Sequence, residues 1–414
     1  MAVLKLERMV HGGHALARLR GGRVALVRGG IPGELVEVDL GVRSGVVTGK
    51  VTRIVEASEH RVEASPHPGL DYSFISYPAQ LVCKRAVVSD ALKRATGKDY
   101  TVPELTPSPH IWHYRHAVQP AVTPSGLGYR LQDSRQVEVL EGGDPAAHRA
   151  INSAWARWSE VALGKGGKGV VEVALRCNDQ GEVLACLIAR ASPRNYLGVA
   201  HDLVRRGYAG VAYAAYDPRG RFRSGSERLA GKRSIRQSYG RFQVEVTSTS
   251  FAQPNPGAAS LLYSQLSAVA STGDTALDLY AGNGVIAMHV AANFERVLAV
   301  ELDRGSVTRG RRDAKRAGVD NIEFVQADVK RMNSFAGADT IFVDPPRAGV
   351  AKPVREAIIA SPADRLVYVS CDVATWARDV AHFTAAGFDL AVLQPYDFFP
   401  HTHHVEVLSL LRRA

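Results

Sequence analysis

From about Gln253 onward, the sequence alternates short apolar segments with amphipathic ones, and this alternation is what most restricts the possible folds. TALDLY, RVLAVEL, IEFVQAD and DTIFVDPP are typical of buried parallel strands, and the stretches between them have helical periodicity. The alternation predicts a doubly wound α/β sheet. FDLAVLQPYD and HVEVLSLLRR have no helix between them, which predicts a terminal antiparallel hairpin at the edge of the sheet.

The first 250 residues follow two other patterns. Residues 1–62 contain short β segments separated by glycine pairs, which predicts a small closed, OB-like β-barrel. Residues 63–250 mix helical segments, such as Leu81–Arg94, with strand segments, and predict a central α+β domain. We therefore expect three domains, at residues 1–62, 63–250 and 251–414. The barrel is interpreted as an RNA-binding module, with a purely structural cap as the alternative.

Charge and composition indicate the partner and the compartment. The formal net charge of +10 favours a polyanionic partner, with nucleic acid as the leading candidate. The four cysteines form no C-x-x-C pair, and charges interrupt the N-terminal segment too often for a signal peptide. Apolar runs are too short to span a membrane. We expect a cytoplasmic, soluble monomer without membrane association.

A glycine motif marks a ligand site in the predicted sheet. The segment Asp278–Gly284 (DLYAGNG) follows a strand and precedes a helix, and Gly282 lets the backbone approach a ligand closely. Glu301 ends the next strand, where an acid can bind ribose hydroxyls, and Asp328 follows the third strand, where a carboxylate can accept from an adenine amino group. Met288 replaces the third glycine of dinucleotide-binding loops. These residues favour adenosine without phosphates, as in S-adenosylmethionine, over a domain that binds no nucleotide.

Two further positions follow predicted strands at the same edge of the sheet. Asp344 opens the segment DPPR, in which two prolines form a rigid loop. Cys371 lies in VYVSCD, between Ser370 and Asp372. A cysteine is more often a buried apolar residue than a nucleophile. The polar neighbours and the nearby acid loop nevertheless favour a nucleophilic role for Cys371.

The last polar cluster is the run HTHHVE. Histidines at 401, 403 and 404 suggest a metal site, but no cysteine or acid completes a tetrahedral set at a familiar spacing. We therefore expect no metal. Successive side chains of the final strand point to opposite faces, so Glu406 can point back toward the ligand edge of the sheet.

Five motifs carry a resemblance to a known family. SFAQPN, DLYAGNG, DPPRAG, VYVSCDVATWARD and FFPHTHHVEV occur over residues 250–410 in the order and spacing of RNA uracil-C5 methyltransferases, which make 5-methyluridine in tRNA and ribosomal RNA. The sequence resembles this family, and residues 1–62, with HGGHALAR and PGELVEV, resemble the TRAM barrel of many members. The resemblance implies a Rossmann-like methyltransferase domain that acts on RNA.

The resemblance also assigns residues. It implies Cys371 as the nucleophile and Glu406 as the base. The residues that it implies around S-adenosylmethionine are Gln253, Tyr280, Glu301, Asp328 and Asp344. Some members bind a [4Fe–4S] cluster through four cysteines between the barrel and the middle domain. This chain has only Cys83 there, so we expect no iron–sulfur cluster.

The implied mechanism is covalent. A thiolate adds at C6 of the pyrimidine, C5 takes the methyl group, and a base removes the C5 proton. This requires the pKa of Cys371 to be lowered from about 8.5. The family usually has Asn where this chain has Val285, and again where it has Asp372.

The target base therefore stays open between uridine, the leading interpretation, and cytidine. An ionised Asp372 can only accept hydrogen bonds, which suits the amino group of cytosine, although it could instead cap the following helix. Two further alternatives are an exocyclic-amine methylase and an RNA-binding protein with a decayed active site.

Overall fold

The N-terminal part of the chain is a closed β-barrel. The computed structural model describes residues 1–132, 134–162, 167–220, 222, 225–332 and 334–413. The barrel strands pair in the order β1-β2-β3-β5-β4, with β3 and β5 parallel. Small side chains, including Ala15, Ala17 and Ala25, are fully buried inside, and the predicted barrel is confirmed. The strands are β1 (Ala2–Val10), β2 (His14–Arg18), β3 (Val24–Arg28), β4 (Leu35–Arg43) and β5 (Val46–Glu56).

The middle of the chain forms a mixed sheet in the order β13-β12-β11-β10-β7-β8-β9, and β6 pairs with β10. Helices α2 and α3 pack on it through buried Trp155, Trp158 and Leu203. A separate hairpin of β14 and β15 leads into the C-terminal part. The elements are β6 (Ala117–Val118), β7 (Ala121–Thr123), β8 (Gly126–Arg130), β9 (Val137–Val139), α2 (Arg149–Ala162), β10 (Val170–Cys177), β11 (Val183–Ala189), η2 (Pro193–Tyr196), α3 (Leu197–Arg205), β12 (Gly210–Ala215), β13 (Glu227–Gly231), β14 (Ser234–Tyr239) and β15 (Phe242–Thr247).

The C-terminal part is a doubly wound sheet in the order β18-β17-β16-β19-β20-β22-β21, as the alternation of segments predicted. β22 runs antiparallel to both β20 and β21, so the predicted terminal hairpin is confirmed, with β21 at the edge. The elements are α4 (Pro256–Ala270), β16 (Gly273–Leu279), α5 (Val285–Val290), η3 (Ala291–Asn293), β17 (Phe294–Glu301), α6 (Arg304–Arg316), β18 (Ile322–Gln326), η4 (Val329–Arg331), β19 (Thr340–Val343), α7 (Lys352–Ala360), β20 (Arg365–Ser370), α8 (Val373–Ala385), β21 (Phe388–Tyr396) and β22 (Glu406–Arg413).

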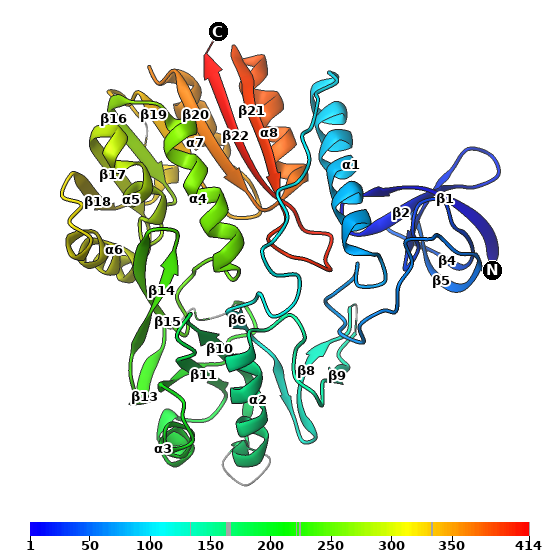
Figure 1. Ribbon diagram of the computed structural model, residues 1–414, viewed down its shortest axis with the longest axis horizontal. Helices are drawn as coiled ribbons and strands as arrows, with labels where there is room; N and C mark the ends of the chain where they lie inside the picture. The colour runs from blue at the N-terminus through cyan, green and yellow to red at the C-terminus, as the bar shows by residue number, and fades with distance from the viewer. Residues whose placement is uncertain (133, 163–166, 221, 223–224, 333, 414) are drawn as a thin grey trace.

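Helix α1 (Tyr77–Thr96) lies between the barrel and the C-terminal sheet (Figure 1). It is longer than the predicted helix, because Pro78 starts it in the first turn and Gly97, with a φ of 71°, ends it. Buried Val87, Val88 and Leu92 belong to a core shared with the barrel and with α8. α1 thus belongs to the expected central domain by position but packs on α8 of the C-terminal part and on β1 of the barrel, and the domain borders remain a proposal. No described helix has both the length and the apolar character needed to cross a membrane.

Candidate active site

The loops that carry the predicted site residues meet at one edge of the C-terminal sheet. Strands β16 to β20 are parallel, so their carboxyl ends lie at the same edge. β22 is antiparallel to β20, so its amino end comes to this edge as well. The predicted residues that end, follow or begin these strands are Tyr280, Gly282, Glu301, Asp328, Asp344, Cys371 and Glu406.

The loop after β16 leaves room for a ligand. Tyr280, Gly282 and Gly284 have positive φ angles of 63°, 55° and 75°, so the chain turns sharply before α5. A Cβ added at Gly284 would overlap the ring of Phe324, whereas one added at Gly282 would meet no atom within 4 Å. Gly282 is therefore a point at which a ligand can approach the backbone.

Carboxylates surround this glycine loop. Glu301 Oε2 accepts a hydrogen bond from the backbone N–H of Gly282 (2.9 Å), which ties the loop to β17. Asp278 is fully buried near the end of β16, where its Oδ2 accepts from the N–H of Ala287 (3.0 Å). Its Oδ1 has no hydrogen-bond partner among the described residues. Burial, together with the charges of Asp344 and Glu301, raises the pKa of Asp278 to about 8.

Asp328 and Tyr280 are neighbours beside the same loop. Burial raises the pKa of Tyr280, and the charge of Asp328 adds to this shift. Asp328 is half-buried at the start of η4, where its Oδ1 accepts from the N–H of Lys330 (3.0 Å). Asp328 is thus held on the loop that follows β18, near the tyrosine of the glycine motif.

The segment Gln253–Asn255 is anchored beside the loop that precedes β22. Asn255 Nδ2 donates to the carbonyl of Phe398 (2.9 Å), and its Oδ1 accepts from the N–H of Ala258 (3.1 Å) at the start of α4. The carbonyl of Gln253 accepts from the hydroxyl of Tyr239 (2.7 Å). The backbone of Gln253 is therefore fixed, and its side chain is half-buried.

Cys371 and Glu406 are brought together by the register of β20 and β22. Ser370 pairs with Val407 across the two strands, so the residue after β20 lies beside the first residue of β22. Cys371 is half-buried, and Glu406 is fully buried. Neither carboxylate oxygen of Glu406 has a hydrogen-bond partner in the described part of the chain. A thiol and a carboxyl group without a partner in the described chain therefore lie side by side.

Buried carboxyl groups shift the pKa values of the groups around Cys371. Burial and the charge of Asp344 raise the pKa of Glu406 well above its usual value, and Arg347 opposes this shift. Burial raises the pKa of Asp344 to about 7. Burial, Glu406 and Asp344 raise the pKa of Cys371 to about 12. The protein by itself does not supply the lowered thiol pKa that the mechanism requires, whereas a cation bound beside Cys371 would lower it.

This environment predicts how the reactivity of Cys371 depends on pH. The thiolate is the reactive form, so alkylation of Cys371 by iodoacetamide should accelerate about tenfold per pH unit from about pH 7 to pH 10, without levelling off. Mass spectrometry of the labelled peptide, with Cys371→Ala to identify the signal of Cys83, measures this rate. A plateau near pH 9 would show that burial does not raise the thiol pKa.

Asp372 caps helix α8. Its Oδ1 accepts from the N–H and from the hydroxyl of Thr375 (2.9 and 3.0 Å). Its Oδ2 lies 3.6 Å from Nε2 of His11, a barrel residue. The side chain of Asp372 therefore occupies the helix-capping position that was the alternative to contact with the target base.

The loop from Asp397 to His404 directs its histidines to different partners. His401 is buried, stacks on Trp112 with ring centroids 3.7 Å apart, and lies 3.0 Å through Nδ1 from Gln80 Nε2. His403 Nδ1 lies 2.6 Å from Asp71 Oδ2. Among the described residues, no group of three or more His, Cys, Asp or Glu side chains is arranged to hold a metal ion.

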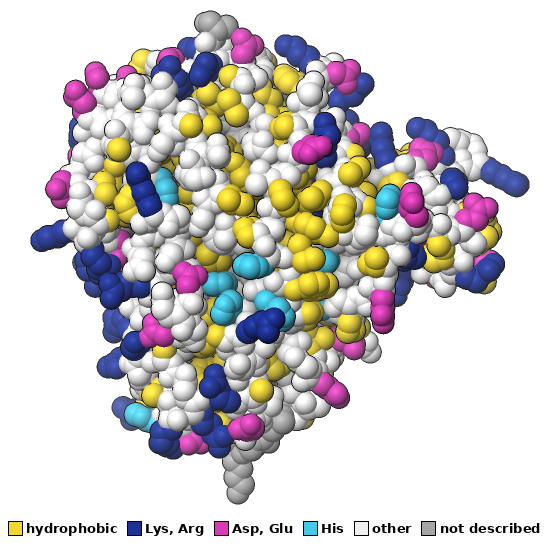
Figure 2. Space-filling view, in the orientation of Figure 1, with side chains coloured by type: hydrophobic (Ala, Val, Ile, Leu, Met, Phe, Trp, Pro, Cys, Tyr) yellow, Lys and Arg dark blue, Asp and Glu magenta, His cyan; other side chains and the backbone are white. Residues whose placement is uncertain are grey.

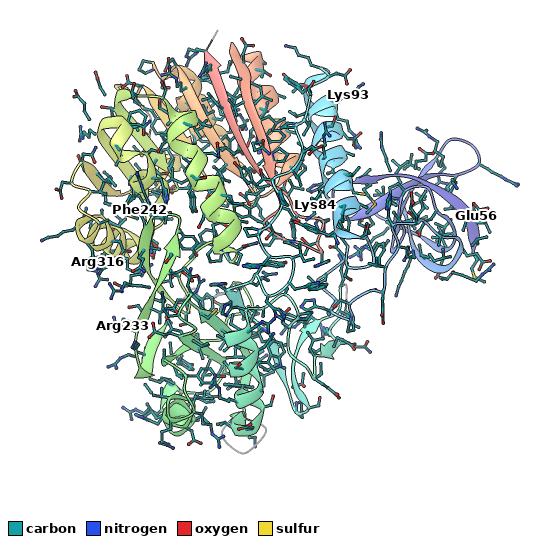
Figure 3. All side chains as sticks on the ribbon, viewed as in Figure 1. Glu56, Lys84, Lys93, Arg233, Phe242 and Arg316 are labelled. Carbon is teal, nitrogen blue, oxygen red and sulfur yellow. The ribbon has the colours of Figure 1, made fainter. Side chains whose placement is uncertain are left out.

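A buried ion pair fixes the start of this loop. Lys84 of α1 (Figure 3) is fully buried, and its Nζ donates to Asp397 Oδ1 (2.7 Å) and to the carbonyl of Phe399 (3.0 Å). The N–H of Phe399 donates to the same Asp397 oxygen (3.1 Å). Helix α1 thus determines the path of the chain into Glu406.

Lys84→Met should destabilise the protein by about 3–5 kcal/mol, because it leaves the carboxylate of Asp397 buried without its counter-charge. Lys93→Met on the same helix breaks an exposed pair with Asp99 and should cost less than about 1 kcal/mol. Urea unfolding of the two variants measures the difference. Equal midpoints for both would mean that the buried pair contributes little.

The β1–β2 turn of the barrel lies near the active-site loops. His11 in this turn lies near Asp372 at the start of α8. A Cβ at Gly13 would overlap Asp71 and lie 3.1 Å from His403 Nδ1. Gly13 also has a φ of 79°, which disfavours other residues. The turn therefore packs too closely against these loops for a side chain at this position.

Comparison with known proteins gives the family. The sequence profile of the tRNA (uracil-5-)-methyltransferase family matches residues 232–414. An uncharacterized RNA methyltransferase from Gloeobacter violaceus is 30% identical, over 97% of this chain and 94% of that protein. The chain belongs to this family of RNA methyltransferases. Another uncharacterized RNA methyltransferase, from Thermotoga maritima, is 28% identical over 99% of this chain and 98% of that protein.

A solved structure shows that the fold of this RNA methyltransferase is shared over its full length. It is the tRNA (uracil-54, C5)-methyltransferase of Pyrococcus abyssi in complex with S-adenosyl-L-homocysteine. The two chains superpose with a TM-score of 0.77 at 24% identity, over 99% of this chain and 100% of the other. The barrel, the central sheet and the doubly wound sheet thus recur together.

Several residues of this RNA methyltransferase shape the site without having been assigned a role from sequence. Asp278 was noted only as the first residue of the glycine motif, and Asn255 only as the last residue of SFAQPN; neither was given a role. Asn before Pro256 is a helix N-cap signal that could have identified Asn255. Phe251 is 76% exposed two residues before Gln253, which places an aromatic ring at the surface near the site. No sequence pattern around Lys84 indicated that this residue would be buried beside the site.

Proposed function

We propose that the chain transfers a methyl group from S-adenosylmethionine to C5 of a pyrimidine in RNA, with uridine as the favoured base. The proposal depends on one observation, the placement of Cys371 beside the fully buried Glu406 at the carboxyl edge of the sheet. Methylation of an exocyclic amine needs no thiol, so it would not require Cys371. An RNA-binding protein without catalytic activity would not require a buried acid beside this thiol.

S-adenosylmethionine fits the residues around the glycine loop. Gly282 leaves space for a ligand, and Asp278 presents an oxygen without a partner in the described chain. Glu301 and Asp328 add acceptors suited to hydroxyl and amino groups. This concentration of carboxylates favours a cationic ligand over a phosphate. When bound, the cofactor supplies an electrophilic methyl group on a sulfonium.

Cys371 and Glu406 divide the remaining chemistry. The Cys371 thiolate adds to C6, which moves the C5–C6 electron pair toward C5 and O4 and makes C5 nucleophilic. After C5 is methylated, Glu406 accepts the C5 proton, the C5–C6 double bond re-forms, and Cys371 leaves as a thiolate. A carboxylate that is buried without partners binds a proton more strongly than a solvated one, which suits Glu406 to this step.

Uridine is favoured because the argument for cytidine required Asp372 to accept a hydrogen bond from the amino group of the base. One oxygen of Asp372 accepts from Thr375, and the other lies 3.6 Å from His11 Nε2, so the side chain is held at the start of α8. The uracil-54 named for the Pyrococcus abyssi enzyme agrees with this preference.

The products of one incubation test the proposal. Unmodified tRNA and ribosomal RNA transcripts, incubated with methyl-labelled cofactor and digested to nucleosides, should yield labelled 5-methyluridine. Asp372→Asn should give the same product at a similar rate, because Asn also caps helices. Labelled 5-methylcytidine alone would overturn the choice of base. The absence of any label in RNA would overturn the proposed activity.

A further inference from the structure

A strip of half-buried histidine, arginine and aromatic side chains passes the active site. It is named the histidine–arginine strip and consists of Arg28, His14, His403, His404, Phe399, Arg115, His116 and His148. Figure 2 shows histidine side chains gathered near the middle of one face, between the C-terminal sheet and the central sheet. The proposed methyl-transfer chemistry uses none of these residues.

The centre of the strip lies beside the catalytic pair. The charge of Arg347 acts on His404, and it also acts on Cys371 and Glu406. His404 also lies two residues before Glu406, the first residue of β22, so these groups lie close together. Burial lowers the pKa of His404 to about 3, so its ring is neutral at physiological pH.

One arm of the strip runs from His404 to the barrel. The rings of His404 and His403 are 4.1 Å apart between centroids, and His403 is paired with Asp71. A Cβ at Gly13 would lie 3.1 Å from His403 Nδ1, and a Cβ at Gly12 would lie 3.6 Å from His14 Nδ1, which places the barrel next to His403. Nε of Arg28 donates to Nε2 of His14 at 2.8 Å. This arm ends on a barrel arginine.

The other arm runs from His404 to the central sheet. The ring of Phe399 lies 5.8 Å from that of His404, and the guanidinium of Arg115 lies 5.8 Å from the Phe399 ring. His116 follows directly in the chain, and its ring is 4.6 Å from that of His148 at the start of α2. The central arm therefore consists of two side-chain groups, one with Phe399 and Arg115 and one with His116 and His148, which are joined by the backbone between Arg115 and His116.

The chemistry of the strip suits a single strand of nucleic acid. Unpaired RNA binds to proteins through arginines that contact phosphates and through planar rings on which bases stack. Arg28 and Arg115 supply the cations, and Phe399 and the imidazoles supply planar faces. Asp71 Oδ2 lies 2.6 Å from His403 Nδ1, and Asp179 Oδ1 lies 3.9 Å from His116 Nδ1, so two carboxylates border the strip.

We propose that the histidine–arginine strip holds the single-stranded RNA on both sides of the target pyrimidine, with one flank on the barrel arm and the other on the central arm. This inference rests on the proposed function, because the flanks are defined by the base that Cys371 attacks. A docked protein would not need the strip to continue on both sides of the catalytic pair.

Binding measurements test the two arms separately from the chemistry. The probe is a fluorescein-labelled, unstructured RNA of about 12 nucleotides with one 5-fluorouridine at its centre, titrated without cofactor. The double variants His14→Ala/Arg28→Ala and His116→Ala/His148→Ala should each weaken binding about tenfold. Combining both pairs should multiply the losses, because the arms contact different nucleotides.

Two controls separate recognition from general charge and from misfolding. Arg296→Ala removes an exposed arginine at the start of β17, on the opposite edge of the sheet, and should change affinity less than about twofold. His148→Lys adds a cation to the central arm and should tighten binding about threefold, which a misfolded variant cannot do. Weakening by Arg296→Ala as large as that by either arm would overturn the proposal, as would unchanged affinity in both double variants.

Adduct formation with the same probe reports on the proposed function. With S-adenosylmethionine present, Cys371 adds to C6 and C5 is methylated, but fluorine at C5 cannot leave as a cation, so the thiolate is not released and the adduct persists. An adduct in the wild-type protein with undiminished RNA binding by both double variants supports the methyl-transfer function and overturns the strip. Weakened binding by both double variants with no wild-type adduct supports the strip and contradicts the covalent function.

Discussion

Cys371→Ala should reduce methyl transfer by a factor of about 10³ or more while leaving S-adenosylmethionine affinity within about twofold of wild type. The thiol is needed to make C5 nucleophilic, whereas the residues around the glycine loop are those placed to hold the cofactor. Transfer of tritium from labelled cofactor to RNA measures the first effect, and calorimetric titration of the cofactor measures the second.

Cys83→Ala is the matched control for this experiment. Cys83 is also a half-buried free thiol, but it lies on α1, and its replacement should leave the rate unchanged. More than a few per cent of wild-type turnover in Cys371→Ala would exclude this residue as the nucleophile.

Glu406→Gln should stop the reaction after methylation and trap a protein–RNA adduct. The amide has nearly the volume of the acid but cannot take the C5 proton, so the bond between Cys371 and C6 persists. Turnover should fall by a factor of about 10² to 10⁴. A denaturing gel that resists heat and detergent should show the adduct as a band that contains both protein and RNA.

The double variant Cys371→Ala/Glu406→Gln is the control, because without the thiol no adduct can form. Glu406 is fully buried, and its oxygens have no hydrogen-bond partner in the described chain, so the amide should fold without losing a specific contact. Normal turnover in Glu406→Gln, or normal RNA binding without an adduct, would assign the proton transfer to another group.

The fold of the C-terminal part was predictable because its signals are local. Three of the predicted strands are short, mainly apolar segments that lead to a polar residue. They are β17, β18 and β20, which lead to Glu301, Asp328 and Ser370. Parallel strands bring the residues at their carboxyl ends to one edge of the sheet, independently of the fold of the other domains. The barrel was predictable for a similar reason, since its strands are short and separated by glycines. Each of these arguments depends on neighbours within one segment.

The rest of the site depends on contacts between distant segments, which leave no local pattern. Lys84 is one cation in a helix of mixed character, and only the folded chain pairs it with Asp397. Gln80 and His401 contact each other across a similar distance in the sequence. Burial raises the pKa of Cys371 most, and the charges of Glu406 and Asp344 from distant segments add to this shift, so spacing could not reveal it.

The placement of α1 has a consequence for the order of synthesis. The ribosome releases α1 long before α8 and Asp397, whereas barrel strand β1, which α1 also contacts, has already emerged. Until the C-terminal part is synthesised, the side of α1 that faces α8 lacks its partner, and Lys84 lacks its counter-charge. A chain that ends before α8 should therefore expose this side of α1 even when the barrel is folded.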